Sequence, residues 1–199
     1  MEPETTSNHQ SDPDQASVWT RLRDATPEDF RTIELLNGPY LADLPSRIIA
    51  AVDALDVTGM GFTIGRRQHS LQSATRALRD GREMEYVVAC LVHDVGDELA
   101  PYNHGAFAAD ILAPYVSEQT SFVIRVHPIV QQQLYAPNMR AVATAADHLK
   151  DHHWYKDALR FCEEYDENSF DPTYVNLELE EFVPLVHEVF GRKAWSHRE

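Results

Sequence analysis

The chain has 199 residues and a formal net charge of −15, from 17 basic and 32 acidic side chains. This charge repels nucleic-acid phosphates and anionic lipids, so neither nucleic acid nor a membrane surface is an expected partner. No apolar run approaches the roughly 18 residues that a membrane helix needs, and the N-terminus lacks the pattern of a secretory signal. Both cysteines, Cys90 and Cys162, lie in apolar runs, which is typical of reduced core residues and of a cytoplasmic protein.

Residues 1–17 are expected to form a disordered tail, because they are polar and show no hydrophobic periodicity. Residues 18–199 are long enough to bury one core and are predicted to form a single domain. A helix should begin after Thr26, and a second should span residues 45–55. The glycine-containing segment 57–65 is predicted to be a flexible loop that connects the second helix to the next one, with a substrate lid as the alternative.

Residues 67–80 are predicted to form a helix that ends before Gly81. Its periodicity puts His69 opposite the apolar face, beside Gln72 and Arg76. Periodicity alone therefore predicts a solvated histidine at this position.

The apolar run Tyr86–Val92 leads directly into His93 and Asp94. A run of seven apolar residues indicates a buried segment. We expect it to be a helix over residues 83–93. A buried imidazole and carboxylate at its end need compensation, and a metal ion is the commonest group that provides it.

Further helices are expected over residues 103–112, from 117 to about 127, 154–166 and 179–190. Asn103 and Ser117 are the predicted N-caps of the first two, and Pro128 should end or kink the second at His127. Three histidines among charged residues are interpreted as solvated: His148, His152 and His153. Because no segment alternates as a strand does, the predicted fold class is all-α.

Six potential ligands lie on different predicted helices or helix ends: His69, His93, Asp94, His104, His127 and Asp166. Four imidazoles and two carboxylates are too many for one tetrahedral zinc ion. They suit two octahedral ions bridged by one carboxylate, which helical bundles build in their cores.

Five sequence blocks, in this order, resemble the HD-domain superfamily and more narrowly its diiron oxygenase branch, including the myo-inositol oxygenases: HSLQSATRALRDG, LVHDVGD, NHGAF, IRVHP and FCEEYD. The resemblance covers about residues 66–190. It implies an HD-domain helical bundle with a dinuclear metal site in its core, and it makes His69 a ligand in spite of its polar helix face.

Carried over residue by residue, the resemblance assigns three ligands to one iron: His69, His93 and Asp166. It assigns His104 and His127 to the second iron, with Asp94 as the bridge. The implied activity is oxidation or cleavage of a small hydroxylated substrate by an Fe(II)/Fe(III) pair, with O2 as co-substrate. Gln72 and Arg76 could support His69 from behind, and surface positions are the alternative for both.

Asp97 departs from these relatives, because the inositol enzymes carry a lysine there and the hydroxyalkylphosphonate-cleaving enzymes a histidine. A carboxylate there would favour a neutral polyol or a substrate with an amine or ammonium group. Alternatively, Asp97 orients a ligand or caps a helix. Arg66 and Arg67 could meet an anionic group from the other side of the site.

Two other functions are compatible with this superfamily. The first is a metal-dependent phosphohydrolase or phosphodiesterase, in which the metals activate water. The acidic charge and Asp97 count against phosphate substrates. The second is a regulatory module without activity, and the presence of all six ligand positions counts against it.

Overall fold

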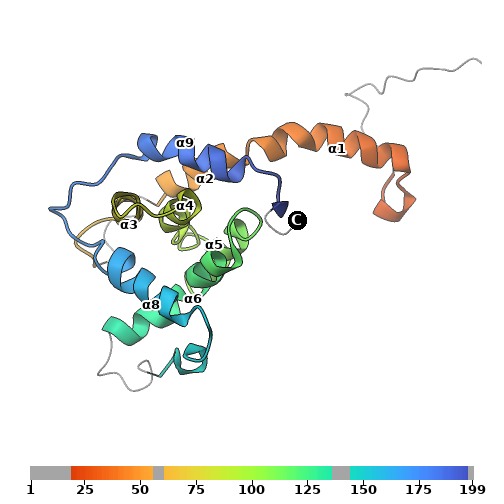
Figure 1. The fold of residues 1–199 in the computed structure, drawn as a ribbon. Helices are drawn as coiled ribbons and strands as arrows, with labels where there is room; N and C mark the ends of the chain where they lie inside the picture. The colour runs from red at the N-terminus through yellow and green to blue at the C-terminus, as the bar shows by residue number, and fades with distance from the viewer. Residues whose placement is uncertain (1–18, 56–60, 136–143, 197–199) are drawn as a thin grey trace, which may run out of the picture. The chain divides into compact units, whose positions relative to one another are not determined.

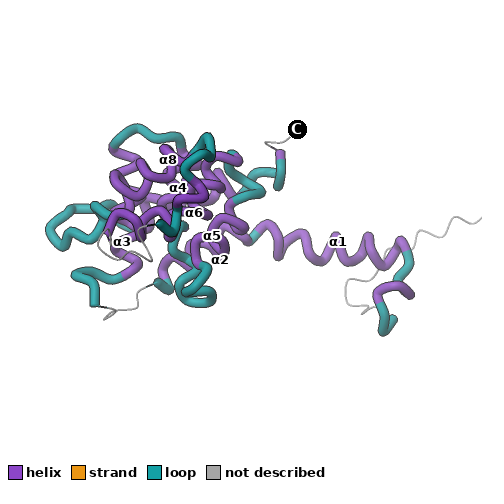
Figure 2. The backbone as a smooth tube through the Cα atoms, turned by 90° about the horizontal axis from the view of Figure 1, so that it is seen from below, coloured by secondary structure: helices purple, strands orange, loops and turns teal. Residues whose placement is uncertain are grey.

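The computed structural model describes residues 19–55, 61–135 and 144–196, and in these ranges it contains helices and turns but no strand (Figures 1 and 2). The all-α prediction is therefore confirmed for this part of the chain. The tail predicted for residues 1–17 lies outside the described residues, as does part of the loop predicted for 57–65. None of the described helices is long and apolar enough to cross a membrane.

The contacts within the chain divide it into two compact units, Met1–Leu44 and Pro45–Glu199. The single domain predicted for residues 18–199 stays a prediction. The first unit contains a short 3₁₀ turn, η1 (Leu22–Asp24), and helix α1 (Pro27–Ala42).

The predicted start of α1 after Thr26 is confirmed by a capping box. The Asp29 N–H donates to the Thr26 hydroxyl over 3.2 Å, and the Thr26 N–H donates to the Asp29 carboxylate over 2.7 Å. Two N–H groups that the helix itself leaves unpaired are satisfied in this way.

The remaining elements are α2 (Leu44–Asp53), α3 (Arg66–Arg79), α4 (Met84–Val92), α5 (His104–Leu112), α6 (Glu118–Tyr135), η2 (Asp147–Leu149), α8 (Tyr155–Phe161), η3 (Cys162–Asp166) and α9 (Leu179–Phe190). Five of them, α2 to α5 and α9, begin and end within two residues of the predicted bounds. The Ser117 cap of α6 is also confirmed, because its hydroxyl accepts from the Thr120 N–H over 3.2 Å. Asn103 precedes α5, but its side chain makes no capping hydrogen bond.

Helix α4 is the centre of the second unit and packs against α3, α6 and α9 (Figure 1). All residues from Tyr86 to Val92 are buried, as an apolar surface on every side of a helix requires. Cys90 and Cys162 are buried and free, which confirms their prediction as reduced core residues.

Two helices differ from the prediction. Helix α6 continues past Pro128 to Tyr135, so the expected end at His127 is wrong, and the alternative of a kink there stays a prediction. The helix predicted for 154–166 is divided into α8 and the π-helical turn η3. A π turn holds one more residue than an α turn, and here Cys162, Tyr165 and Asp166 are all buried.

The three histidines interpreted as solvated lie apart from the core. His148 and His153 are exposed, as predicted. His152 is half-buried, because its ring stacks on Phe122 with 3.8 Å between the ring centroids.

Candidate metal centre

The structure brings all six predicted ligands together, from five different elements. His69 lies on α3, while His93 and Asp94 follow the last residue of α4. His104 is the first residue of α5, His127 lies within α6, and Asp166 ends η3. Five of the side chains are at most 3% exposed, and His104 is 19% exposed.

One group, the first cluster, consists of His69, His93 and Asp166. The Nε2 atoms of His69 and His93 are 3.1 Å apart, and Nε2 of His69 is 3.2 Å from Oδ1 of Asp166. Oδ2 of Asp94 lies 3.5 Å from Nε2 of His69 and 3.4 Å from Nε2 of His93.

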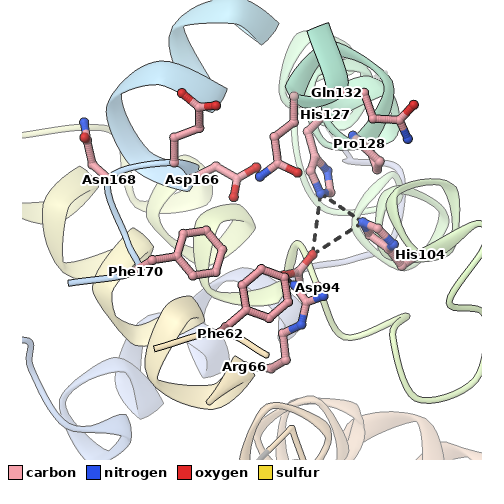
Figure 3. A pocket seen from close by; sticks show the side chains of 12 residues that line it. Phe62, Arg66, Asp94, His104, His127, Pro128, Gln132, Asp166, Asn168 and Phe170 are labelled. Atoms are coloured by element: carbon pink, nitrogen blue, oxygen red, sulfur yellow. Dashed lines mark hydrogen bonds and ion pairs between the residues drawn. The ribbon is translucent and has the colours of Figure 1, made fainter. Parts of the chain in front are cut away.

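The second cluster consists of His104 and His127, whose Nε2 atoms are 3.3 Å apart. Both Nε2 atoms lie 3.5 Å from the other carboxylate oxygen of Asp94, Oδ1 (Figure 3). The two oxygens of one carboxylate therefore face two different pairs of imidazoles.

Within each cluster, the distances between neighbouring donor atoms are close to those between ligands of a single metal ion. Donors at about 2.1 Å from a metal lie about 3.0 Å apart at octahedral angles and about 3.4 Å apart at tetrahedral ones. Among the described residues, three overlapping sets of possible ligands lie within 4.8 Å: His69, His93, Asp166; His93, Asp94, His127; and Asp94, Asp97, His104.

The four imidazoles all turn Nδ1 toward a backbone carbonyl: Ser169 for His69 at 3.0 Å, Cys90 for His93 at 2.7 Å, Ile124 for His127 at 2.7 Å and Pro101 for His104 at 3.3 Å. Because a carbonyl only accepts, each Nδ1 carries the proton, and each neutral imidazole has a lone pair on Nε2. Oδ2 of Asp166 is also buried and finds no hydrogen-bond partner in the described part of the chain. The centre is thus a buried set of acceptors, and this donor set fits metal ions.

The local sequence explains how His127 is oriented. Pro128 has no N–H, so the Ile124 carbonyl lacks its usual partner four residues later. The Nδ1–H of His127 donates to that carbonyl instead. His93 acts similarly at the end of α4, where the Cys90 carbonyl is one of the last in the helix.

Two glycines that the sequence analysis did not single out allow the elements to approach. A Cβ on Gly96 would lie 2.6 Å from Cα of His104. A Cβ on Gly105 would lie 2.7 Å from Cδ of Pro128. Both glycines lie within two residues of a predicted ligand, and this position in the sequence could have indicated their role.

Gln72 and Arg76 hold the loop 168–171 in place. The Gln72 side chain donates to the Asp171 carbonyl over 2.7 Å and accepts from the Asp171 N–H over 3.3 Å. Arg76 donates to the Asn168 carbonyl over 2.7 Å. This loop contains the carbonyl that orients His69. The surface alternative is wrong for Gln72, which is fully buried, and Arg76 is half-buried. Their support of His69 stays a prediction.

The three residues predicted to contact substrate have different surroundings. Arg66 lines the cavity, and its guanidinium pairs with Asp94 at 3.2 Å and with Asp97 at 3.1 Å. Asp97 also lies 3.1 Å from Nδ1 of His104, which favours the alternative that it orients a ligand. Arg67 pairs with Asp53 at 2.8 Å and is not brought to the site.

Burial and charge shift the pKa values of these groups in opposite directions. Burial raises the pKa of Asp94, but the surrounding imidazoles, with His93 first, hold it well below its usual value. Burial lowers the pKa of His93 to about 4. For His69 and His127 burial acts in the same direction, but the hydrogen bonds and charges of Asp166 and Asp94 outweigh it and raise both pKa values.

A cavity of about 690 Å³ opens beside the clusters, which is ample for a small molecule (Figure 3). The sequence analysis missed most of the residues in its outer wall: Phe62, Pro128, Gln131, Gln132, Asn168 and Phe170. Phe62 and Phe170 stack with 5.1 Å between their centroids, and Phe170 also stacks on His69 at 4.3 Å. No periodic pattern marks these residues, because they come from loops and from the polar side of α6.

Comparison with known proteins matches the chain to no family model and to no curated protein.

Proposed function

We propose that the chain is an HD-domain oxygenase with a mixed-valent diiron centre, which oxidises or cleaves a small hydroxylated substrate with O2. One observation carries the dinuclear part of this proposal. The two oxygens of Asp94 face separate pairs of imidazoles, and all four imidazoles present lone pairs inward.

In this proposal His69, His93 and Asp166 would hold one iron, and His104 and His127 would hold the other. Asp94 would be a ligand shared by both. When bound, the iron pair supplies the redox chemistry by which O2 oxidises a carbon that bears a hydroxyl group. The protein fixes the ligands through their Nδ1 hydrogen bonds and leaves one side of the centre open to the cavity.

The cavity wall supports a neutral or ammonium-bearing substrate more than a phosphate ester. Arg66 is the one lysine or arginine among its described lining residues, and Asp94 and Asp97 already neutralise it. The amides of Gln132 and Asn168 can bind hydroxyl or amine groups, while the stacked rings of Phe62 and Phe170 provide an apolar surface.

Iron content and electron paramagnetic resonance test this proposal. Protein loaded with Fe(II) under anaerobic conditions should contain two irons per chain, and partial oxidation should produce the signal of a coupled Fe(II)/Fe(III) pair. Addition of myo-inositol, ethanolamine or choline as probes should then identify a compound that changes the signal and accelerates O2 consumption.

The test variant is His104→Ala, which removes a proposed ligand. Its matched control is His148→Ala, which removes an exposed histidine. Only His104→Ala should abolish the coupled signal. A protein without this signal that hydrolyses para-nitrophenyl phosphate in the absence of O2 would instead be a phosphohydrolase.

A further inference from the structure

Asp97 is a half-buried carboxylate that the proposed reaction does not use. Its side chain is 14% exposed and is not among the residues that line the cavity. Oδ1 of Asp97 lies 3.1 Å from Nδ1 of His104, and Oδ2 lies 3.1 Å from Nε of Arg66. Both oxygens therefore lie at ion-pair distance from charged or titratable groups inside the protein, although Oδ2 makes no hydrogen bond in the described part of the chain.

His104 has the weakest backbone support of the four histidines. Its Nδ1 lies 3.3 Å from the Pro101 carbonyl, whereas the other three Nδ1 atoms lie 2.7 to 3.0 Å from theirs. It is also the most exposed of the four, at 19%, and it begins a helix without a side-chain cap. The Asp97 carboxylate oxygen lies closer to Nδ1 than the Pro101 carbonyl does, at 3.1 Å, so its negative charge adds to the hydrogen bond that Nδ1 makes with Pro101.

Arg66 lies at ion-pair distance from the other oxygen of Asp97. Its guanidinium pairs with Asp97 through Nε and with Asp94 Oδ2 through Nη1, at 3.1 and 3.2 Å. A continuous chain of contacts thus runs from His104 through Asp97 and Arg66 to Asp94. A carboxylate beside the remote nitrogen of a ligand histidine favours the tautomer that carries the proton on that nitrogen and makes the other nitrogen a stronger ligand.

We infer that Asp97 is a positioning residue that orients His104 and thereby sets the metal affinity of the second cluster. This inference rests on the proposed dinuclear site. It uses Asp97 differently from the substrate contact predicted from the sequence, because the carboxylate acts through a ligand. The first cluster contains no such carboxylate, since backbone carbonyls orient both of its histidines.

The test is an anaerobic titration of the full chain with Fe(II), in which stoichiometry and both dissociation constants are measured by calorimetry and elemental analysis. In Asp97→Asn the first ion should bind as in wild type, and the second should bind 10- to 100-fold more weakly. Asp97→Glu retains the carboxylate and should recover part of that loss. The coupled electron paramagnetic resonance signal of Asp97→Asn should decrease in favour of an uncoupled iron signal.

Asp110→Asn is the matched control, because Asp110 lies on α5, is exposed and pairs with Arg125 on α6. Both ions should bind to it as to wild type. If wild type binds two ions and Asp97→Asn binds both unchanged, or loses both equally, the inference is wrong while the dinuclear proposal stands. A wild-type chain that binds one ion overturns both.

Discussion

The Nε2 atoms of His69 and His93 lie 3.1 Å apart, although in the neutral imidazoles neither carries a proton. Their Nδ1 protons are donated to the carbonyls of Ser169 and Cys90, so two lone pairs face each other in a buried site. Such an arrangement is unfavourable unless a cation or a proton lies between the two nitrogens.

Substitution of single ligands should show that the two clusters bind their metal ions independently. His69→Ala and His104→Ala should each reduce the metal content by about one ion per chain, because each removes a ligand of one cluster. Asp94→Ala should lose both ions, because its two oxygens serve both clusters. Elemental analysis after desalting measures these losses. Full metal content in all three variants would show that the ligand assignment is wrong.

Metal affinity should rise with pH between about 6 and 8. The raised pKa values of His69 and His127 mean that these imidazoles hold protons above the ordinary value of 6.5, and an incoming metal ion must displace them. His93, whose pKa burial lowers to about 4, has no proton to lose in this range. Affinity should increase about tenfold per pH unit for each proton released.

Calorimetry in two buffers with different ionisation enthalpies counts the released protons. The number of protons released on metal binding should fall toward zero at pH values well above the pKa values of His69 and His127. An affinity that does not change between pH 6 and 8 would contradict this prediction.

Gly105→Ala should disturb the second cluster. The added Cβ at position 105 would lie 2.7 Å from Cδ and Cγ of Pro128. Helices α5 and α6 would therefore have to separate, which would move His104 away from His127. We expect a loss of roughly 1–3 kcal/mol in the free energy of unfolding, which is typical of overpacking. The second metal ion should be lost before the first.

Gly38→Ala is the control for this substitution, because a Cβ at Gly38 meets nothing within 4 Å. Gly38 lies inside α1, so alanine there should leave metal binding unchanged and add up to about 1 kcal/mol of stability. Equal metal binding by Gly105→Ala and Gly38→Ala in a calorimetric titration would refute the close-approach argument.

Gln72→Leu should lower the metal affinity of the first cluster, although Gln72 is not itself a proposed ligand. The substitution leaves the N–H and the carbonyl of Asp171 without their partner, at a cost of about 1–3 kcal/mol. Release of this loop should also move the Ser169 carbonyl that orients His69. Thermal unfolding and metal titration measure the two effects. Gln119→Leu, which changes an exposed glutamine on α6, should show neither.

Most of the fold could be predicted from local sequence. The apolar run of α4 indicated the central helix, the Thr26 and Ser117 caps marked two helix starts, and α9 has the predicted bounds. These features depend on residues within a few positions of one another, which periodicity and capping rules describe directly. The residue types and the order of the six candidate ligands were also visible in the sequence.

Only the tertiary structure decided which atoms meet. His69 is oriented by a carbonyl 100 residues away, and Gln72 binds a backbone group 99 residues away, so periodicity wrongly put both on a solvated face. The π-helical turn before Asp166 and the partners of Asp97 likewise depend on packing between elements distant in the chain. The sequence alone therefore determined the helices and the candidate ligands. Their grouping around the two oxygens of Asp94 arises from long-range contacts, which local rules cannot describe.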